Sequence, residues 1–123
     1  MADYGKVRYY GHLVTFTTVQ ITQAGAAYKL LHTGVTGTFG RLHALIGTLE
    51  AAGSIQIWSD DNGAGANQTA LSGLISMDAN GGLVIPFNPD PRGCVTTVSG
   101  KFMSLQSVGD GFNGYAVVSS CAV

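Results

Sequence analysis

The sequence predicts an all-β protein, a single-domain antiparallel β-sandwich or jelly-roll-like barrel of about eight or nine strands. Between residues 53 and 86, short apolar runs are separated at near-regular intervals by turns rich in Gly, Asn and Asp. This pattern is typical of antiparallel strands. The chain has 123 residues, which is enough for one two-layer core but not for two. We therefore expect one β-sandwich domain, residues 10–123, preceded by an N-terminal arm, residues 1–9.

The first strands are indicated by β-branched and aromatic residues between residues 9 and 22. Val14 and Phe16 share one face of this segment, whereas Val19 and Ile21 share the other. The change of phase near residues 17–18 predicts either a β-bulge or the end of one strand and the start of the next. A short strand is expected to follow at residues 28–31.

Residues 41–50 fit two interpretations. Their large apolar residues recur at helical spacing from Leu42 to Leu49, which favours an amphipathic helix. Gly47 and Thr48 interrupt that stripe, and all neighbouring segments are expected to be β. We favour a strand here and keep a helix as the open alternative.

The rest of the chain continues as alternating strands and turns. The strand that ends at Trp58 is followed by an Asp-Asp-Asn-Gly turn, whose residues favour a tight hairpin. Two prolines in residues 87–93 indicate a loop, because proline cannot donate a ladder hydrogen bond. Further strands are expected at residues 71–77, 83–85, 94–98, 102–108 and 115–123.

The composition predicts a surface that associates with other proteins. Hydrophobic residues make up 46% of the chain and charged residues 11%, whereas charged residues usually make up about 25% of a globular domain. With so few charges, part of the surface is expected to be buried against other copies or another protein. A neutral surface rich in Ser and Thr is the alternative.

Charge and hydropathy argue against nucleic-acid and membrane partners. The net charge is −1 and the six basic residues are scattered, so no stripe exists to neutralise a run of phosphates. The chain has no apolar run long enough for a transmembrane helix. Its first residues lack the apolar middle of a signal peptide, and we expect a protein made in a cytoplasm.

No motif indicates catalysis or a cofactor. His12, His32 and His43 do not have metal-ligand spacing, and the carboxylates lie mostly in turns. The Asp- and Asn-rich turn at residues 60–65 lacks the distal ligands of a calcium loop. We expect no metal, no cofactor and no enzymatic activity, with half-buried histidines beside backbone partners.

Two cysteines, Cys94 and Cys121, fall in expected strands. A disulfide between neighbouring strands is one alternative, because an assembled particle meets oxidising surroundings. Two buried, reduced thiols that pack as small apolar groups are the favoured alternative for a protein made in a cytoplasm.

The N-terminal arm is the expected partner interface. It carries Tyr4, Lys6, Arg8, Tyr9 and Tyr10, whereas a terminus without a partner is usually loose and polar. An extended arm of β-forming residues can add a strand to the sheet edge of a neighbouring subunit.

Several segments resemble those of small virion-surface proteins of tailed bacteriophages, of the capsid decoration (cement) type. These segments are residues 53–60 (Gly-x-Ile-x-Ile-aromatic-x-Asp), 71–73, 82–87 and 114–118, and the N-terminal third lies outside the resemblance. The resemblance implies a non-catalytic β-barrel or jelly-roll oligomer that binds the major capsid protein of the assembled head shell. It places the protein on the capsid surface of a virion, and head-shell symmetry favours a homotrimer.

A receptor- or glycan-binding module of a phage tail tip or fibre is the alternative function. Trp58 can stack on a sugar ring, and Asp60, Asp61 and Asn62 follow it closely as polar contacts. Such a module requires an exposed aromatic side chain flanked by polar loops. A ring-forming tail component is a weaker alternative. A cupin-like enzyme is weaker still, because the chain lacks a histidine–carboxylate cluster.

Overall fold

The computed structural model describes the backbone of residues 6–9, 12–88 and 93–121 and the side chains of residues 15–88 and 93–120. Every regular element in these ranges is a β-strand, and the strands form two antiparallel sheets. The expected β-sandwich is therefore confirmed. The strands are β1 (Lys6–Tyr9), β2 (His12–Thr22), β3 (Tyr28–His32), β4 (Phe39–Leu49), β5 (Gly53–Asp60), β6 (Thr69–Ala70), β7 (Ile75–Met77), β8 (Gly82–Ile85), β9 (Val95–Thr96), β10 (Phe102–Val108) and β11 (Phe112–Cys121).

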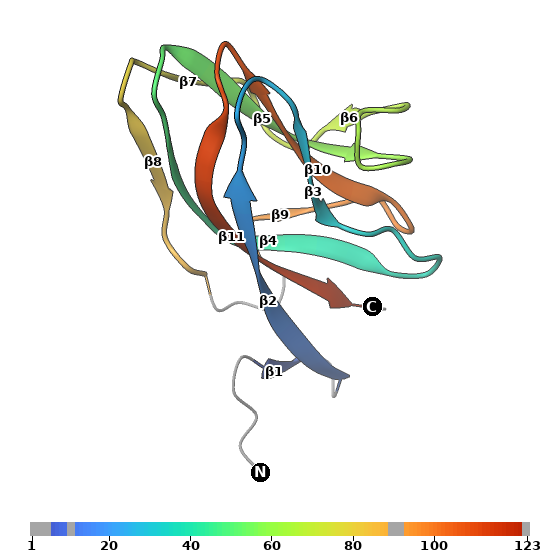
Figure 1. The fold of residues 1–123 in the computed structure, drawn as a ribbon. Helices are drawn as coiled ribbons and strands as arrows, with labels where there is room; N and C mark the ends of the chain where they lie inside the picture. The colour runs from blue at the N-terminus through green and yellow to red at the C-terminus, as the bar shows by residue number, and fades with distance from the viewer. Residues whose placement is uncertain (1–5, 10–11, 89–92, 122–123) are drawn as a thin grey trace.

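The two sheets form the two layers of the sandwich, as Figure 1 shows. One sheet has the order β1-β2-β11-β4-β8, with β9 also paired to β4, and is named here the six-stranded sheet. The five-stranded sheet has the order β3-β10-β5-β6, with β7 also paired to β5. Strands β2, β3, β4 and β5 alternate between the two sheets, so strands that are neighbours in space, such as β2 and β11, are far apart in sequence.

Strand β2 runs without a break through the expected change of phase. Its pairing with β11 is continuous from Thr22, opposite Asn113, to Phe16, opposite Ser119. The predicted bulge or break is therefore wrong. Successive side chains of a strand point to opposite faces, so the core-facing Val19 of β2 places Phe16 on the outer face of the sheet.

Strand β4 confirms the strand interpretation of residues 41–50. A β-bulge explains the helical spacing of its leucines, because the pairing of β4 with β11 shifts register at His43. The extra residue brings Leu42 and Leu45, three positions apart, to the same side of the strand. Both of these leucines, and Leu49 after them, are buried in the core.

Of the strand expected at residues 71–77, only Ile75–Met77 forms, as β7; β6 (Thr69–Ala70) lies before the expected segment, and both short strands pair with β5. Between them, the hydroxyl of Ser72 accepts a hydrogen bond from the N–H of Ile57 at 3.0 Å. The carbonyl of Ser72 accepts one from Nε2 of Gln56, also at 3.0 Å. These side-chain contacts replace ladder hydrogen bonds, so the segment follows β5 without forming a continuous strand. Strands β1 and β6, which were not expected as separate strands, account for a strand count above the expected eight or nine.

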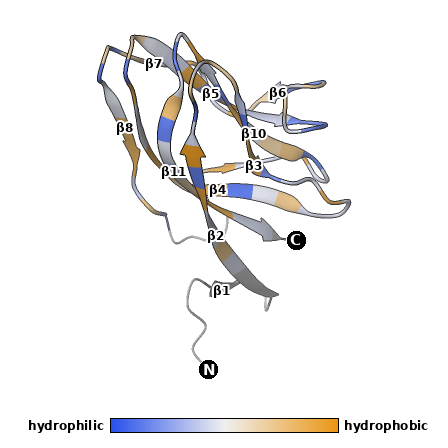
Figure 2. Ribbon diagram, in the orientation of Figure 1, coloured by the Kyte–Doolittle hydropathy of each residue, from blue (hydrophilic) through white to orange (hydrophobic). Residues whose placement is uncertain are grey.

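The hydrophobic core lies between the two sheets. Leu45 from the six-stranded sheet and Ile55 and Leu105 from the five-stranded sheet are 0% exposed. Figure 2 shows hydrophobic segments in both layers, for example along β8 and β10. The equally buried Phe112 lies over Gly47 of β4, where an added Cβ would stand 2.4 Å from its ring. Glycine at this position therefore lets the aromatic side chain pack against the strand.

The β1–β2 hairpin extends beyond the rest of the sandwich (Figure 1). Strand β1 pairs with residues 12–15 of β2, whereas β11 pairs with residues 16–22. Within the described ranges, the first part of β2 therefore belongs to a two-stranded ribbon. A two-stranded ribbon is marginally stable in water without further packing. Residues 6–9, expected to lie in the N-terminal arm, are a strand of the six-stranded sheet.

Candidate interaction surface

The outer face of the six-stranded sheet carries exposed apolar side chains. The strand register places Gln20, Tyr115, Ile46 and Val84 in one row across β2, β11, β4 and β8. Tyr115 is 40% exposed and Val84 is 66% exposed, while Ile46 is half-buried. This row lies on the side of the sheet opposite the core.

A second group of apolar side chains lies further along the same face. Phe16 and Phe87 meet edge to face with their ring centroids 5.2 Å apart, and Phe87 is exposed. Val117, which is half-buried, lies opposite Thr18 and between the two groups along β11. We define the outer apolar face as Phe16, Ile46, Val84, Phe87, Tyr115 and Val117.

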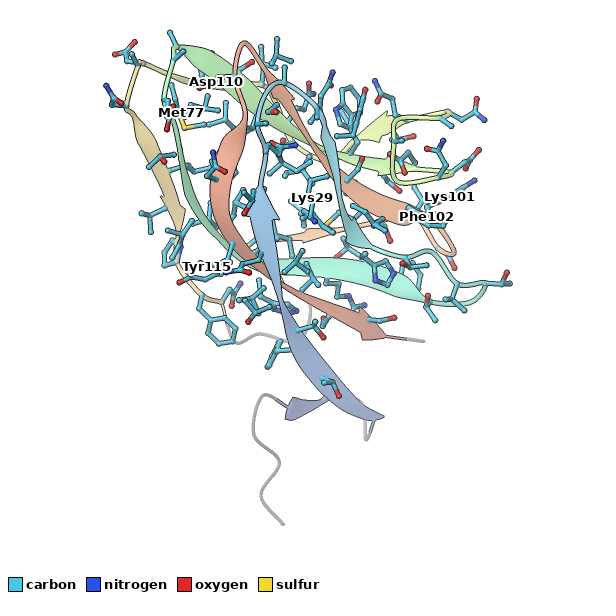
Figure 3. The ribbon with its side chains drawn as sticks, viewed as in Figure 1. Lys29, Met77, Lys101, Phe102, Asp110 and Tyr115 are labelled. Atoms are coloured by element: carbon cyan, nitrogen blue, oxygen red, sulfur yellow. The ribbon has the colours of Figure 1, made fainter. Side chains whose placement is uncertain are left out.

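Uncharged polar residues border the outer apolar face. They are Thr18, Gln20, Thr22, Thr48 and Asn113. Among the described side chains, Glu50 and Asp110 lie at the turn end of the face, beside Thr48 and Asn113. Arg41 of β4 is 6% exposed, so it presents little charge. Figure 3 shows Tyr115 beside β8 and β11, away from Asp110 at the turns.

Phe16 and Phe87 lie against a buried histidine. His43 is 0% exposed, its Nε2 lies 2.7 Å from the Ser119 hydroxyl and its Nδ1 lies 3.0 Å from the Asn88 carbonyl. A Ser–His contact also occurs in enzymes with a serine nucleophile, but here Ser119 is 3% exposed. The pair therefore supports the outer apolar face from beneath. The expected backbone partner is confirmed for His43, whereas the expected half-burial is wrong, because the ring is fully buried.

A different histidine borders an open hollow of about 300 Å³ between β2 and β3. His32 is half-buried, and its Nε2 is buried without a hydrogen-bond partner among the described residues. Burial lowers the pKa of His32. Of the described residues that line the hollow, His32 alone is readily ionisable, so the hollow lacks an acid–base pair. The lining consists of Thr15, Thr17, Val19, Leu31, His32, Val118, Ser119 and Ser120.

Two further findings concern the described part of the chain. No three side chains of His, Cys, Asp or Glu within it are placed to hold a metal ion. The same ranges contain no helix that is long and apolar enough to cross a membrane. The prediction of a half-buried histidine with a backbone partner is not tested for His12, whose side chain lies outside the described ranges.

Trp58, the expected sugar platform, is a half-buried residue of β5 in the five-stranded sheet. Its indole N–H donates a hydrogen bond to Oε1 of Gln106 at 3.0 Å, and in the register it lies opposite Ala70. The ring is therefore held against its own sheet.

Asp60 is a buried, structural carboxylate. It is 0% exposed and accepts hydrogen bonds from the N–H groups of Gly63 at 2.6 Å and Gly65 at 2.9 Å. It also accepts one from the hydroxyl of Ser104 at 2.6 Å. Asp60 thereby holds the shape of the turn that follows β5 and has no surface to offer to a ligand.

Asp61 and Asn62 also serve this turn. Asp61 forms an ion pair with Lys101 and accepts a hydrogen bond from Nδ2 of Asn67 at 2.8 Å. The hydrogen bonds from Lys101 and then from Asn67 lower the pKa of Asp61. Oδ1 of Asn62 accepts a hydrogen bond from the N–H of Ala64 at 2.8 Å. The expected glycan contacts are thus neighbours in space whose polar groups are largely occupied within the turn.

The cysteines lie on opposite edges of β4. The N–H of Cys94 donates to the Leu42 carbonyl on the β9 side, whereas Cys121 of β11 pairs with Phe39 on the other side. Two strand spacings amount to ~9.6 Å, beyond the ~7 Å between Cα atoms that a disulfide can bridge. Cys94 is accordingly free, and it is exposed rather than buried as expected. The side chain of Cys121 lies outside the described side chains.

The expected interface residues of the N-terminal arm all lie outside the described side chains. Lys6, Arg8 and Tyr9 belong to the backbone of β1, while Tyr4 and Tyr10 fall outside the described residues. The arm interface therefore stays a prediction, and the backbone of β1 is the part of the arm that the structure describes.

No family model matches this chain, and neither a curated protein nor a solved structure matches it. The candidate surface therefore rests on geometry. The outer apolar face was not predicted from the sequence, although residues 9–22 contain one signal for it. There Phe16 falls on the face opposite Val19 and Ile21, and an apolar residue on the solvent side of a strand produces the same change of phase as a bulge.

Proposed function

We propose that this chain is a structural virion protein that decorates and stabilises a bacteriophage capsid by binding the assembled head shell. The outer apolar face is the observation that carries the proposal. Its side chains Val84, Phe87 and Tyr115 are exposed and adjoin partly exposed apolar neighbours. A continuous apolar patch on a protein surface commonly marks a contact with another protein. The low content of charged residues agrees with this role.

The path of the chain also supports the proposal. The orders β2-β11-β4-β8 and β3-β10-β5-β6, with β2 to β5 alternating between the sheets, support the expected jelly-roll-like path. Jelly rolls occur in viral capsid proteins and in lectins. The fold agrees with the resemblance in residues 53–60, 71–73, 82–87 and 114–118, but a fold alone does not choose between two functions.

The mechanism in this proposal is structural. A protein that binds the assembled shell, but not its dissociated subunits, stabilises the shell by mass action. Its partners are the major capsid protein and other copies of itself, as a homotrimer, with no nucleic acid, membrane, cofactor or enzymatic step. The β1–β2 hairpin would gain a third strand or a packing surface from a neighbouring subunit. The protein would be made in the host cytoplasm and reside on the capsid surface.

The glycan-binding alternative has less support. It depends on Trp58, whose indole N–H is already bonded to Gln106. The carboxylate of Asp60 is buried, and the amide oxygen of Asn62 is bonded to the backbone of its own turn.

Binding to heads tests the proposal directly. Purified protein would be mixed with empty, expanded heads made from the major capsid protein of the same genome, and bound protein would be separated by sedimentation. We expect binding that saturates and an increase in the melting temperature of the heads. Unassembled capsid subunits serve as the control and should not bind. Protein that stays in the supernatant and leaves the heads unchanged would contradict the proposal, and binding to a glycan that requires Trp58 would favour the alternative.

A further inference from the structure

We propose that residues 1–5 continue β1 along the free edge of β2 and place the side chain of Tyr4 in the hollow beside His32. The inference stands apart from the proposed function, because the hollow lies between the edges of the two sheets and not on the outer apolar face. Strand β2 supplies the edge, since its residues 16–22 pair with β11 on one side, whereas β1 reaches only residues 12–15 on the other. No other described strand pairs with that side of β2. Unpaired N–H and C=O groups on an edge strand are a template for an additional strand.

The register of β1 directs the residues that precede it along this edge. Lys6 lies opposite Thr15, and the two residue numbers of every pair between β1 and β2 add up to 21. Continued in the same register, residues 1–5 lie opposite residues 16–20 of β2. No loop separates this segment from β1, because residue 5 adjoins Lys6. The chain's own first residues therefore reach the edge at a higher effective concentration than a separate partner does.

A strand in this register directs Tyr4 inward. Tyr4 lies opposite Thr17, and opposite residues of an antiparallel pair direct their side chains to the same face of the sheet. Thr17 lines the hollow together with Thr15 and Val19, and Val19 packs against the hydrophobic core. The face that Tyr4 shares with Thr17 is therefore the one that borders the hollow. Asp3, the next residue along the strand, points to the solvent, where a carboxylate keeps its hydration.

The hollow suits a single aromatic side chain. Its volume of about 300 Å³ lies at the lower end of the range for pockets that bind small molecules. Leu31 and Val118, which are each 4% exposed, supply apolar walls. Thr15 and Thr17 are exposed although they lie on the inner side of β2, so the described residues leave this end of the interior uncovered. The ring of Tyr4 would cover it and bury apolar surface on both sides of the contact.

His32 supplies the polar contact that favours tyrosine over phenylalanine. Its Nε2 is buried without a hydrogen-bond partner among the described residues, and buried polar atoms are rarely left unpaired in native proteins. The imidazole lies against Gly40, where a side chain would collide with it. A flip of the ring exchanges Nε2 with Cε1 and turns Nε2 away from Gly40 without a change of shape. The hydroxyl of Tyr4 both donates and accepts hydrogen bonds, so it can pair with either tautomer of His32.

Nuclear magnetic resonance of the full-length chain tests the placement of Tyr4. We expect nuclear Overhauser contacts between the ring of Tyr4 and the methyl groups of Leu31 and Val118. Alternate amides of residues 16–20 should exchange roughly tenfold more slowly than in a variant that lacks residues 2–5, because they gain partners in the added strand. If the contacts are absent, or if these amides exchange equally in the two proteins, the inference is overturned.

Substitutions at neighbouring positions test the hollow itself. Tyr4→Ala should lower the equilibrium constant for folding by roughly tenfold, because it uncovers the hollow. The matched control Asp3→Ala, on the opposite face of the strand, should change this constant by less than about twofold. Equal effects of the two substitutions would overturn the inference. Tyr4→Phe should lower the constant by about threefold in the wild type and leave it unchanged in a His32→Leu background. Equal effects of Tyr4→Phe in both backgrounds would overturn the hydrogen bond to His32.

The origin of the added strand is tested with a mixture of two samples. Equal amounts of isotope-labelled and unlabelled full-length protein are unfolded together, refolded and examined for the contacts of Tyr4 with Leu31 and Val118. We expect these contacts within single chains only. Contacts between labelled and unlabelled chains would show that neighbouring copies exchange their first residues, and would overturn the pairing of residues 1–5 with β2 of the same chain.

Discussion

Asp60 and its surroundings show how one buried residue shapes a loop. A carboxylate without exposed surface is costly to bury unless its oxygens are hydrogen-bonded, and Gly63, Gly65 and Ser104 supply these bonds. Gly63 and Gly65 have positive φ angles of 75° and 93°, which glycine adopts at little cost. The turn therefore depends on Asp60, which ends β5, and on two glycines whose positive φ angles direct their N–H groups toward its carboxylate.

Replacing Asp60 with Asn should lower the free energy of unfolding by about 1–3 kcal/mol, because the amide loses charge-assisted hydrogen bonds and brings a donor beside the donors of the turn. Urea unfolding of the purified variant measures the change. The matched control is Asp61→Asn, since the neighbouring Asp61 lies on the surface and pairs with Lys101. We expect the control to unfold close to the wild type. A larger loss in the control than in Asp60→Asn would contradict the structural role of Asp60.

His32 predicts a component of stability that depends on pH. Burial holds its pKa below the ordinary value of 6.5, so the unfolded chain binds a proton at a higher pH than the folded chain does. The contribution is therefore complete above the ordinary value and is lost as pH falls toward the lower folded pKa. We expect His32→Gln to lose less stability than the wild type between about pH 7.5 and pH 5.5 in urea unfolding. Identical losses in the two proteins would contradict this assignment, because all other histidines are common to both.

At the scale of the element, β11 lies between β2 and β4 and depends on a close approach of its backbone to β4. Gly114 faces Gly47 in the register, and a Cβ added to Gly114 would stand 1.9 Å from the carbonyl oxygen of Ile46. A backbone carbonyl in a paired strand cannot move away without breaking the ladder. The pair of glycines is therefore a packing requirement of the sheet rather than a flexible point.

Gly114→Ala should consequently destabilise the protein by about 2–4 kcal/mol, a severe case of overpacking, or prevent folding. Gly73→Ala is the matched control, because no atom lies within 4 Å of a Cβ added there. Thermal unfolding followed by circular dichroism compares the two variants. Equal melting temperatures for Gly114→Ala and Gly73→Ala would show that the close approach of β11 and β4 does not limit the fold.

The β1–β2 hairpin predicts a step in hydrogen exchange within one strand. Residues 16–22 of β2 pair with β11, whereas residues 12–15 pair with β1 alone among the described strands. Amides of residues 6–9 and 12–15 should exchange much faster than those of residues 16–22 in the free chain, because local opening of a two-stranded ribbon is cheap. Mass spectrometry of peptides from both parts checks this. Equal protection along β2 in the free chain would contradict the prediction.

The strands could be predicted from the sequence to a large extent, because alternation and turn residues are local. Which face of a strand points inward is not local, since it depends on which strand lies opposite. Phe16 is an example. Its spacing from Val19 puts the two apolar side chains on opposite faces of a regular strand, and the same spacing is also expected if a bulge lies between them. The bulge at His43 of β4 could likewise not be predicted from the sequence, because it is defined by the pairing with β11. The outer apolar face, which combines residues of four strands with Phe87 of the loop after β8, could not be assembled without that pairing.

At the scale of the whole molecule, the two sheets differ in what lies on their outer faces. The turn after β5 folds back over the five-stranded sheet, where Gly63 approaches Leu30 and Gly65 approaches Tyr28. Lys101 and Asp61 form an ion pair on the same side. Over the six-stranded sheet, the described part of the loop after β8 places Phe87 against Phe16 and Asn88 against His43. Both sheets carry exposed large apolar side chains, Val84, Phe87 and Tyr115 with the six-stranded sheet and Leu30, Leu74 and Val108 with the five-stranded sheet, but the described surface ion pair lies with the five-stranded sheet.

This difference in charge predicts how binding to heads responds to salt. Contacts through the outer apolar face should have nearly the same dissociation constant in about 0.05 M and 0.5 M NaCl, because screening weakens charge pairs and not apolar contacts. Ammonium sulfate should tighten binding, since sulfate strengthens apolar burial. Sedimentation of the wild-type protein with heads measures both effects. A dissociation constant that rises roughly tenfold with NaCl would show that charges hold the protein on the shell, and would move the interface toward Lys101 and Asp61 on the five-stranded sheet.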